Sequence, residues 1–395
     1  MKSNMYIEKT KKFFADSYKY ITAFWGKTAS VKSGRRTYTI YPAKIFVTLV
    51  VIIMVAALAV SLFSAGGGTD VLDLDVQTGS RHMTKQINGD VLIYNNQGAA
   101  AVDVNGKIKW TIDAAVSDPL VEADGDYLLV SDLSGKHFAA SYKDGKMLQE
   151  FELENDIISA KITDKGYCVF ATDTDGYKGK VTVFNKRGKK LYEWNSGSGY
   201  ISDVDITDNG KYLAVSQLMT DGTSPDTRIQ IINTRRGETV ASAVRGGEIC
   251  AGMRFASNNR LIVVTDRSIA GYSIGGREKF NISLTGKSPS LYNIDSDDTI
   301  AVVTLDGRGN SVLELYSASG RLRGAYTTSG DIKALSISGR GAIVAQQKGI
   351  SRINARGKEK STVNVAHDIK SIGYFGDKSR AVVVGSDRAE VISVK

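Results

Sequence analysis

The pattern of apolar and polar residues changes twice along the chain and divides it into three parts. Residues 7–25 repeat apolar side chains at helical spacing, residues 45–63 are almost entirely apolar, and short alternating runs begin near residue 70. Alternation of apolar and polar positions is typical of strands, whereas a repeat every three to four residues is typical of helices. The sequence therefore predicts an N-terminal helical part followed by a large all-β body.

One uncharged segment is long enough to cross a membrane. Residues 45–63 span nineteen positions, of which only Thr48 and Ser61 are polar. As a helix rising about 1.5 Å per residue, the segment would be roughly 28 Å long, close to the hydrocarbon thickness of a bilayer. Residues 1–44 hold ten Lys and Arg against two Asp and Glu, which places the N-terminus in the cytoplasm. We expect a signal-anchor helix over residues 45–64; a cleaved signal peptide is the alternative.

The cytoplasmic segment, residues 1–44, is expected to include a helix on the inner membrane surface. Its lysines fall largely away from a stripe of apolar residues formed by Ile7, Phe14, Tyr18, Ile21 and Trp25. A basic amphipathic helix of this kind binds anionic headgroups. A loosely ordered tail is the alternative. Residues 65–69 are a glycine-rich linker to the body, residues 70–395.

One short pattern returns seven times in the body. An apolar strand end is followed by a few polar residues, a glycine and, in most copies, Lys or Arg. Tight hairpins favour glycine because they need a positive φ that costs other residues energy. Successive copies lie 37 to 49 residues apart, with glycines at Gly106, Gly145, Gly188, Gly237, Gly276, Gly320 and Gly357. This period, with strand signals only, predicts propeller blades of four antiparallel strands.

A second set of segments predicts the number of blades. Eight near-continuous apolar runs fit strands that neighbouring blades cover on both faces. Seven hairpin glycines for eight runs leave the last blade without an outer strand of its own. We expect Val71, Leu72 and Leu74, within a strand over residues 71–75, to supply it and close the ring. The predicted fold is an all-β, eight-bladed β-propeller behind one transmembrane helix; seven blades are the alternative.

Two copies of the repeat resemble a known family. Residues 101–110, AVDVNGKIKW, resemble the A-x-D-x-x-G-x-x-x-W repeat of quinoprotein-like (PQQ-like) propellers, and residues 184–194 are a degenerate copy. The arrangement also resembles the membrane-anchored propellers of Gram-positive bacteria, which implies an extracytoplasmic module without known chemistry. The quinoprotein dehydrogenases of the family that use the cofactor share a pair of adjacent cysteines. Cys168 and Cys250 are far apart in sequence, so we expect no quinone cofactor.

Charge and cysteine placement narrow the function further. Residues 45–395 carry 41 Lys and Arg against 40 Asp and Glu, so a nucleic-acid-binding body is not expected. Cys168 is assigned to blade 3 and Cys250 to blade 5. Because these blades are not neighbours, the two residues are too far apart for a disulfide, and we expect two buried free thiols.

The remaining motifs favour structural roles. Residues 271–275, GYSIG, match the nucleophile elbow of α/β-hydrolases but coincide with a repeat hairpin instead of a strand–helix corner. Asp173 and Asp175 resemble the start of a calcium loop whose distal acid is missing. The histidines are scattered and form no zinc-ligand set; they are His82, His137 and His367. We expect no catalytic residue, cofactor or metal ion.

The candidate partner-binding residues lie in three long connections between second and third strands. These connections, residues 172–180, 218–228 and 305–310, are predicted to emerge on one face of the propeller. The candidates are Asp173, Asp175, Tyr177, Met219, Asp221, Thr223, Asp226, Arg228 and Arg308. Neutral loop growth is the alternative explanation for any one loop.

These features predict a membrane-anchored extracellular propeller that acts as a non-catalytic protein-interaction or scaffolding module at the cell envelope. Its expected partners are the cell membrane, crossed once, and an envelope protein. One alternative is a propeller-type enzyme, a lyase or dehydrogenase, with acidic, histidine or arginine side chains converging in the central funnel. The other is a ligand sensor that signals through residues 1–44. An interaction module would instead show apolar or aromatic patches around residues 218–228.

Overall fold

The chain divides into two compact units, Met1–Gly68 and Thr69–Lys395. The computed structural model describes residues 29–33, 36–40, 72–74, 82–135, 139–295, 298–339, 341–347, 349–386 and 388–395. In the first unit, β1 (Ala29–Ser33) and β2 (Arg36–Ile40) form an antiparallel pair that was not expected from the sequence. Among the described residues, no helix is both long enough and apolar enough to cross a membrane. The helices expected over residues 7–25 and 45–63 lie outside those residues.

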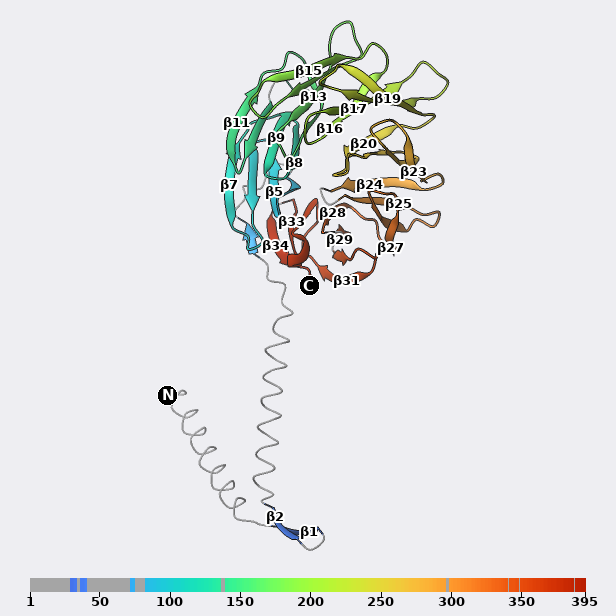
Figure 1. The fold of residues 1–395 in the computed structure, drawn as a ribbon. Helices are drawn as coiled ribbons and strands as arrows, with labels where there is room; N and C mark the ends of the chain where they lie inside the picture. Colours follow the sequence, from blue (N-terminus) through green and yellow to red (C-terminus); the bar gives the residue numbers. More distant parts are fainter. Residues whose placement is uncertain are drawn as a thin grey trace. The chain divides into compact units, whose positions relative to one another are not determined.

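The second unit is a ring of eight four-stranded antiparallel sheets (Figure 1), which confirms the eight-bladed propeller. In blades 1–7 the strands follow one another in sequence from the centre to the rim. Blades 1–4 contain β4 (Met83–Ile87), β5 (Asp90–Asn95), β6 (Gly98–Val102), β7 (Ile108–Asp113); β8 (Pro119–Asp124), β9 (Tyr127–Asp132), β10 (Ala139–Lys143), β11 (Lys146–Phe151); β12 (Ile157–Ile162), β13 (Cys168–Thr172), β14 (Lys180–Phe184), β15 (Lys190–Asn195); and β16 (Tyr200–Ile206), β17 (Tyr212–Met219), β18 (Asp226–Asn233), β19 (Glu238–Arg245).

Blades 5–7 repeat this order. They contain β20 (Cys250–Phe255), β21 (Leu261–Thr265), β22 (Ser268–Tyr272), β23 (Glu278–Ser283); β24 (Ser288–Ile294), β25 (Thr299–Leu305), β26 (Ser311–Ser317), β27 (Leu322–Thr328); and β28 (Ala334–Ser338), β29 (Gly341–Ala345), β30 (Gly349–Ile353), β31 (Glu359–Asn364). Ser273 of the GYSIG motif lies in the turn between β22 and β23, so the motif is part of a hairpin, as expected.

Blade 8 is built from both ends of the second unit. Its three inner strands are β32 (Ser371–Tyr374), β33 (Arg380–Val384) and β34 (Ala389–Ser393), with the short 3₁₀ helix η2 (Gly376–Lys378) between the first two. Its outer strand is β3 (Leu72–Leu74), which pairs antiparallel with β34. Val71 lies outside the described residues. A strand from before blade 1 therefore covers the edge of the last blade.

The strand order gives the propeller two distinct faces. Connections between second and third strands, and those between blades, share one face, which we call the loop face. Connections between first and second strands and between third and fourth strands share the opposite face, which we call the hairpin face. The seven predicted hairpin glycines lie on the hairpin face, and all have φ between +69° and +79°.

The apolar core lies between blades. The second strands coincide with the eight apolar runs predicted from the sequence, and strands such as β13 and β21 are buried along their whole length. Val169 of β13 and Val183 of β14, for example, pack with Val204 and Val215 of the next blade. Because each middle strand is covered by a blade on either side, both of its faces are apolar.

Aromatic side chains seal the rim between blades. A Cβ placed on Gly145 would lie 2.7 Å from Cγ of Trp110 in the preceding blade, and one on Gly320 would clash with the ring of Phe280. Tyr192 is the nearest side chain to Gly237 in the same arrangement. The residue four positions after a hairpin glycine therefore faces the next blade's glycine. In residues 184–194 that residue is Tyr192, and Trp194 is not the equivalent of the repeat tryptophan.

The two cysteines are as predicted. Cys168 lies in the second strand of blade 3 and Cys250 in the first strand of blade 5, and both are buried and free. Burial raises the pKa of each thiol to about 12. Neither thiol is a nucleophile at neutral pH.

Candidate functional site

The three long connections lie on the loop face, in blades 3, 4 and 6. Asp173, Asp175 and Tyr177 lie between β13 and β14, Asp221 and Thr223 between β17 and β18, and Arg308 between β25 and β26. The second connection is shorter than the sequence pattern indicated, because β17 and β18 extend until Met219 pairs with Asp226. Arg228 also lies in β18. The blade 3 and blade 4 residues are neighbours, whereas Arg308 is two blades away.

Four exposed apolar side chains lie at the loop-face ends of blades 3–5. Tyr177, Tyr200, Val244 and Ile249 are 53%, 50%, 58% and 45% exposed. Tyr200 pairs across the sheet with Leu218, and Val244 pairs with Arg228, so the β17–β18 connection lies between them. We call these four residues, with Lys178 and Arg228, the loop-face patch. Of its members, Tyr177 and Arg228 were candidates from the sequence, and the other four were missed.

Two cations order part of the patch. Lys178 Nζ donates to the Tyr200 hydroxyl at 2.9 Å and lies 4.6 Å from the centre of the ring. The Arg228 guanidinium donates to Ser198 Oγ at 3.1 Å. The patch is thus an aromatic and aliphatic surface with positive charge beside it, an arrangement suited to protein contacts.

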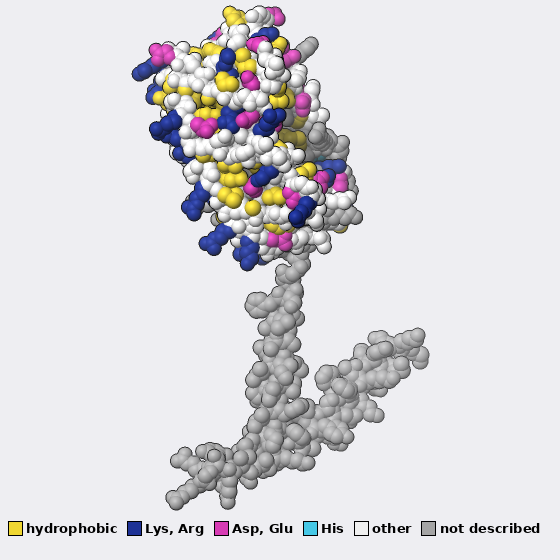
Figure 2. All heavy atoms as spheres, turned by 90° about the vertical axis from the view of Figure 1, so that its right-hand side faces the viewer, with side chains coloured by type: hydrophobic (Ala, Val, Ile, Leu, Met, Phe, Trp, Pro, Cys, Tyr) yellow, Lys and Arg dark blue, Asp and Glu magenta, His cyan; other side chains and the backbone are white. Residues whose placement is uncertain are grey.

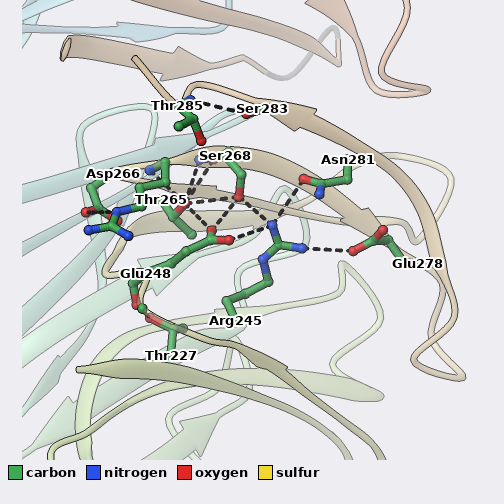
Figure 3. A network of polar contacts seen from close by, with 12 residues as sticks. Thr227, Arg245, Glu248, Thr265, Asp266, Ser268, Glu278, Asn281, Ser283 and Thr285 are labelled. Carbon is green, nitrogen blue, oxygen red and sulfur yellow. Dashed lines mark hydrogen bonds and ion pairs between the residues drawn. The ribbon is translucent and has the colours of Figure 1, made fainter. Parts of the chain in front are cut away.

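A buried arginine holds the blade 4–blade 5 side of the patch (Figure 3). Arg245, at the end of β19, donates to Glu248 and Ser268 at 2.8 Å each, to Glu278 at 2.9 Å and to Asn281 at 3.1 Å. Thr265 and Ser268 complete the network by donating to Glu248. Val244 and Ile249 directly flank the Arg245–Glu248 pair in sequence, so the network fixes the backbone that presents them.

The acidic candidates serve the loop backbone. Asp173 accepts the Asp156 N–H at 3.0 Å, and Asp226 accepts the Gly247 N–H at 2.7 Å. In the described part of the chain, no group of three His, Cys, Asp or Glu residues is arranged to hold a metal ion. Through its bond to Asp156, Asp173 joins its loop to the connection between β11 and β12.

A second concentration of polar side chains lines the centre of the ring. Glu122 of β8 accepts from Lys161 at 2.6 Å and from Lys85 at 2.7 Å, and Arg254 lies 3.2 Å from Asp124. These residues border cavities of about 600 and 260 Å³. The convergence was missed from the sequence, although each residue sits in a first strand. It is the feature that an enzyme with substrate in the funnel would show.

Burial and neighbouring charges shift the pKa values of the carboxyls in this central channel, the space that the first strands enclose. Burial would raise the pKa of Glu122, but the charges of Lys161 and Lys85 outweigh it and hold this pKa at about 2. Burial raises the pKa of Asp205 to about 7, although Arg254 and the Phe255 N–H act in the opposite direction. The pKa of Asp203 is raised for the same reason. A carboxyl that titrates near neutrality is compatible with acid–base chemistry.

The same carboxyls also join neighbouring blades. Asp203 of β16 accepts the Met253 N–H of β20 at 2.8 Å and the Ser159 hydroxyl at 2.8 Å, and Asp205 accepts the Phe255 N–H. The two backbone bonds satisfy N–H groups on the free edge of β20, the first strand of the next blade. This strand has no sheet neighbour on the side that faces the centre of the ring. The channel carboxyls thus have structural partners, and this accounts for their burial.

Comparisons with known proteins identify the fold and a family. A model described as "Family of unknown function (DUF5711)" matches residues 71–394. No curated protein matches the chain. The C-terminal WD40 domain of Sif2 matches at 13% identity and TM-score 0.60, covering 82% of this chain and 98% of that one. BamB from Moraxella catarrhalis matches at 14% identity and TM-score 0.50, covering 82% and 97%. At these identities the likeness shows the propeller fold alone.

Proposed function

The chain belongs to the family of unknown function DUF5711, and from its surface we propose that it is a non-catalytic protein-interaction module displayed outside the cell membrane. The propeller is a rigid ring that presents loops on one face. The loop-face patch is the site at which a protein partner binds. Residues 45–64 anchor the module and residues 1–44 remain in the cytoplasm, as in the membrane-anchored propellers of Gram-positive bacteria that the sequence resembles.

The observation that carries this proposal is the loop-face patch. Two tyrosines, a valine and an isoleucine lie about half exposed on adjoining blades, next to the connection where the sequence predicted a binding surface. Aromatic side chains anchor protein interfaces, because they bury large areas at a small cost in side-chain entropy. The Arg245 network keeps this surface in place before a partner arrives, which lowers the ordering cost of binding.

Site-specific cross-linking in the native membrane tests the proposal. A photoreactive amino acid at Tyr177 should give a discrete adduct with one protein. At Leu322, which is 49% exposed on the rim strand β27, the same probe should give none. Tyr200→Ala, introduced together with the Tyr177 probe, should reduce the adduct several-fold. Adducts of equal yield from Tyr177 and Leu322, or none from either, would contradict an interaction site here.

The second candidate function is an enzyme of lyase or dehydrogenase type with substrate in the central channel. The specific observation in its favour is the convergence of Glu122, Lys161, Arg254 and Asp205 on the cavities. We rank it second because these groups are engaged with one another or with strand backbone. Saturation-transfer NMR with a small-molecule library separates the interaction module from the enzyme. A small molecule whose binding is lost in Asp205→Asn but kept in Tyr200→Ala would favour the enzyme.

A ligand sensor that signals through residues 1–44 is the third candidate. It needs a ligand on the propeller and a response in the cytoplasm. Replacing residues 1–44 by an unrelated basic leader should leave an interaction module functional, because the leader then supplies only topology. Loss of the cellular phenotype, with the protein still in the membrane, would favour the sensor.

A further inference from the structure

The turns between third and fourth strands carry basic side chains on the hairpin face. At least one exposed Lys or Arg lies in or directly after each of these turns in blades 1–7. We call one such residue from each blade the basic ring: Lys107, Lys146, Arg187, Arg236, Arg277, Arg321 and Arg356. In the described part of the chain, none of the seven forms an ion pair within 4.0 Å. Their charges are therefore available to an external anion.

The basic ring has no equivalent on the loop face. The long connections there mix both signs, as in Asp173, Asp175 and Lys178 of blade 3 or Asp306 and Arg308 of blade 6. Figure 2, turned by 90° from Figure 1, shows Lys and Arg side chains along one margin of the propeller while acidic and basic groups are mixed elsewhere on that side. Acidic side chains also lie on the hairpin face, for example Asp144 and Asp208, so the two faces differ by the basic ring and not by an absence of acidic groups.

The polypeptide enters the propeller on the hairpin face. The third strand of each blade runs from the loop face to the hairpin face, and β34 is the third strand of blade 8. Because β3 is antiparallel to β34, with Leu72 opposite Val391 and Leu74 opposite Ala389, β3 runs from the hairpin face toward the loop face. Leu72, its first residue, therefore lies at the hairpin-face end.

We infer that the basic ring binds the phosphate headgroups of the membrane in which the chain is anchored. This inference rests on the proposed anchor at residues 45–64. Seven residues, 65–71, separate Ser64 from Leu72, and fully extended they span about 25 Å. The point of entry is thus held within reach of the bilayer. Attraction between basic residues and an anionic surface acts within about one Debye length, roughly 8 Å at physiological ionic strength.

This orientation gives each face a separate task. Seven basic residues spread around the ring draw the whole hairpin face, and not only its tethered edge, toward the headgroups. The loop-face patch is then directed away from the membrane, where an envelope protein reaches it. The attraction is electrostatic and reversible, so high salt or zwitterionic lipid releases the face while the anchor keeps the protein in the membrane.

Two glycines provide matched positions for a fluorescent label. Gly275, in the blade 5 hairpin, has open space around its missing side chain, and Gly222, in the blade 4 loop, meets nothing closer than 3.5 Å. Both lie far from β3 around the ring. The native Cys168 and Cys250 are buried, so Gly275→Cys or Gly222→Cys labels selectively. Each full-length variant is placed in nanodiscs that contain a headgroup quencher, with either phosphatidylglycerol or phosphatidylcholine as the bulk lipid.

We expect the label at Gly275 to be quenched in phosphatidylglycerol at least about twofold more than in phosphatidylcholine, and the label at Gly222 to be unquenched in both. Arg187→Glu, Arg236→Glu and Arg356→Glu together should abolish this difference. A control with two loop-face reversals, Arg267→Glu and Arg308→Glu, should retain it.

Four results would overturn the inference. Equal quenching at both labels, or quenching that ignores lipid charge and the charge reversals, would show that the hairpin face does not bind headgroups. If inorganic polyphosphate, but not anionic lipid, protected the label at Gly275 from a soluble quencher, and the charge reversals removed this protection, the basic ring would bind a soluble anion and not the membrane. Failure of the chain to enter nanodiscs would refute the anchor and this inference together, but it would leave the cross-linking test of the loop-face patch intact.

Discussion

At the scale of single residues, the innermost strands are joined by buried carboxyls, although burial disfavours the charged form of a carboxyl. Asp205 is only 7% exposed, yet it accepts a backbone N–H that no sheet partner satisfies. Burial raises its pKa to about 7, so near neutrality the fold retains a proton that the unfolded chain releases. Its stabilising contribution is therefore complete below pH 4 or so and is lost as the pH rises through about 7.

Asp205→Asn should remove this pH dependence. Asparagine keeps an oxygen for the Phe255 N–H but does not titrate. Between pH 4 and pH 8 the parent should lose stability relative to the variant, by up to roughly 4 kcal/mol for a shift of about three pKa units. Thermal melting in a pH series measures the difference. Asp221→Asn, at an exposed loop position, should track the parent; an Asp205→Asn curve parallel to the parent would contradict the assignment.

A second single-residue dependence lies at Arg245. Its guanidinium is buried, and five side chains accept from it. Arg245→Met should cost about 3–5 kcal/mol, because Glu248 is left as an unpaired, partly buried charge. The free energy of unfolding of Arg245→Lys should lie between those of the parent and Arg245→Met, since lysine keeps the charge but not the forked geometry. Chemical denaturation measures the stabilities, and exposed Arg308→Met should stay within about 0.5 kcal/mol of the parent.

The patch gives Arg245 a second readout. If the network holds Val244 and Ile249 in place, Arg245→Met should also lower the cross-linking yield from Tyr177 at temperatures where the protein is folded. An unchanged yield would mean that the network stabilises the blade junction without shaping the binding surface.

At the scale of elements, the hairpin glycines join one blade to the next. Gly320 has φ near +79°, and its Cα lies against the Phe280 ring of the preceding blade. Gly286 has nearly the same φ, +78°, but open space around it. This pair separates two costs of adding a side chain: the backbone conformation, which both positions share, and the steric clash, which only Gly320 meets.

Gly286→Ala should cost about 1 kcal/mol, the usual penalty for alanine at a left-handed φ. Gly320→Ala should cost more, about 3 kcal/mol, because overpacking adds to that penalty. In a Phe280→Ala background the cost of Gly320→Ala should fall toward that of Gly286→Ala. Urea denaturation of the four variants measures the coupling. Equal costs for Gly320→Ala with and without Phe280 would rule out the packing role.

Elements with strong local signals could be predicted from the sequence. The turn glycines and the apolar second strands were found because positive φ and burial on both faces each restrict the residue type at their own positions. The channel charges could not be found in this way. Glu122, Lys161 and Asp205 occupy alternate positions of amphipathic strands, where a charged residue ordinarily indicates a solvent-facing side chain. Only ring closure makes these positions converge.

The loop-face patch was predicted only in part for a similar reason. The long connections marked blades 3 and 4, and so Tyr177 and Arg228. Tyr200, Val244 and Ile249 lie at strand ends and in a blade junction, where an apolar residue in sequence is indistinguishable from core. Their exposure depends on where neighbouring blades stop, which is a property of the assembled ring.

At the scale of the whole molecule, the ring is closed at two depths. Toward the centre, Ser371 Oγ accepts the Thr84 N–H at 3.0 Å, and Gln86 donates to the Tyr374 carbonyl at 2.8 Å, so the first strands of blades 8 and 1 are joined directly. Toward the rim, β3 covers the edge of β34, whose Val391 is fully buried. Loss of the outer strand should therefore loosen blade 8 without opening the centre.

Replacing Leu72-Asp73-Leu74 by Gly-Ser-Gly in the full chain isolates this contribution. The linker keeps its length, but the strand loses the side chains that favour pairing. We expect a loss of roughly 3 kcal/mol, seen as a Tm lower by a few degrees. Amide hydrogen exchange should locate the change, with protection lost first in β33 and β34 and retained in blade 4. The same tripeptide in place of Thr220-Asp221-Gly222, an exposed loop of equal length, should leave Tm and exchange unchanged. A parent-like, fully cooperative melt of the β3 variant would mean that the propeller does not need its N-terminal strand, and that the attachment to blade 8 serves only to fix the point at which the chain leaves the hairpin face.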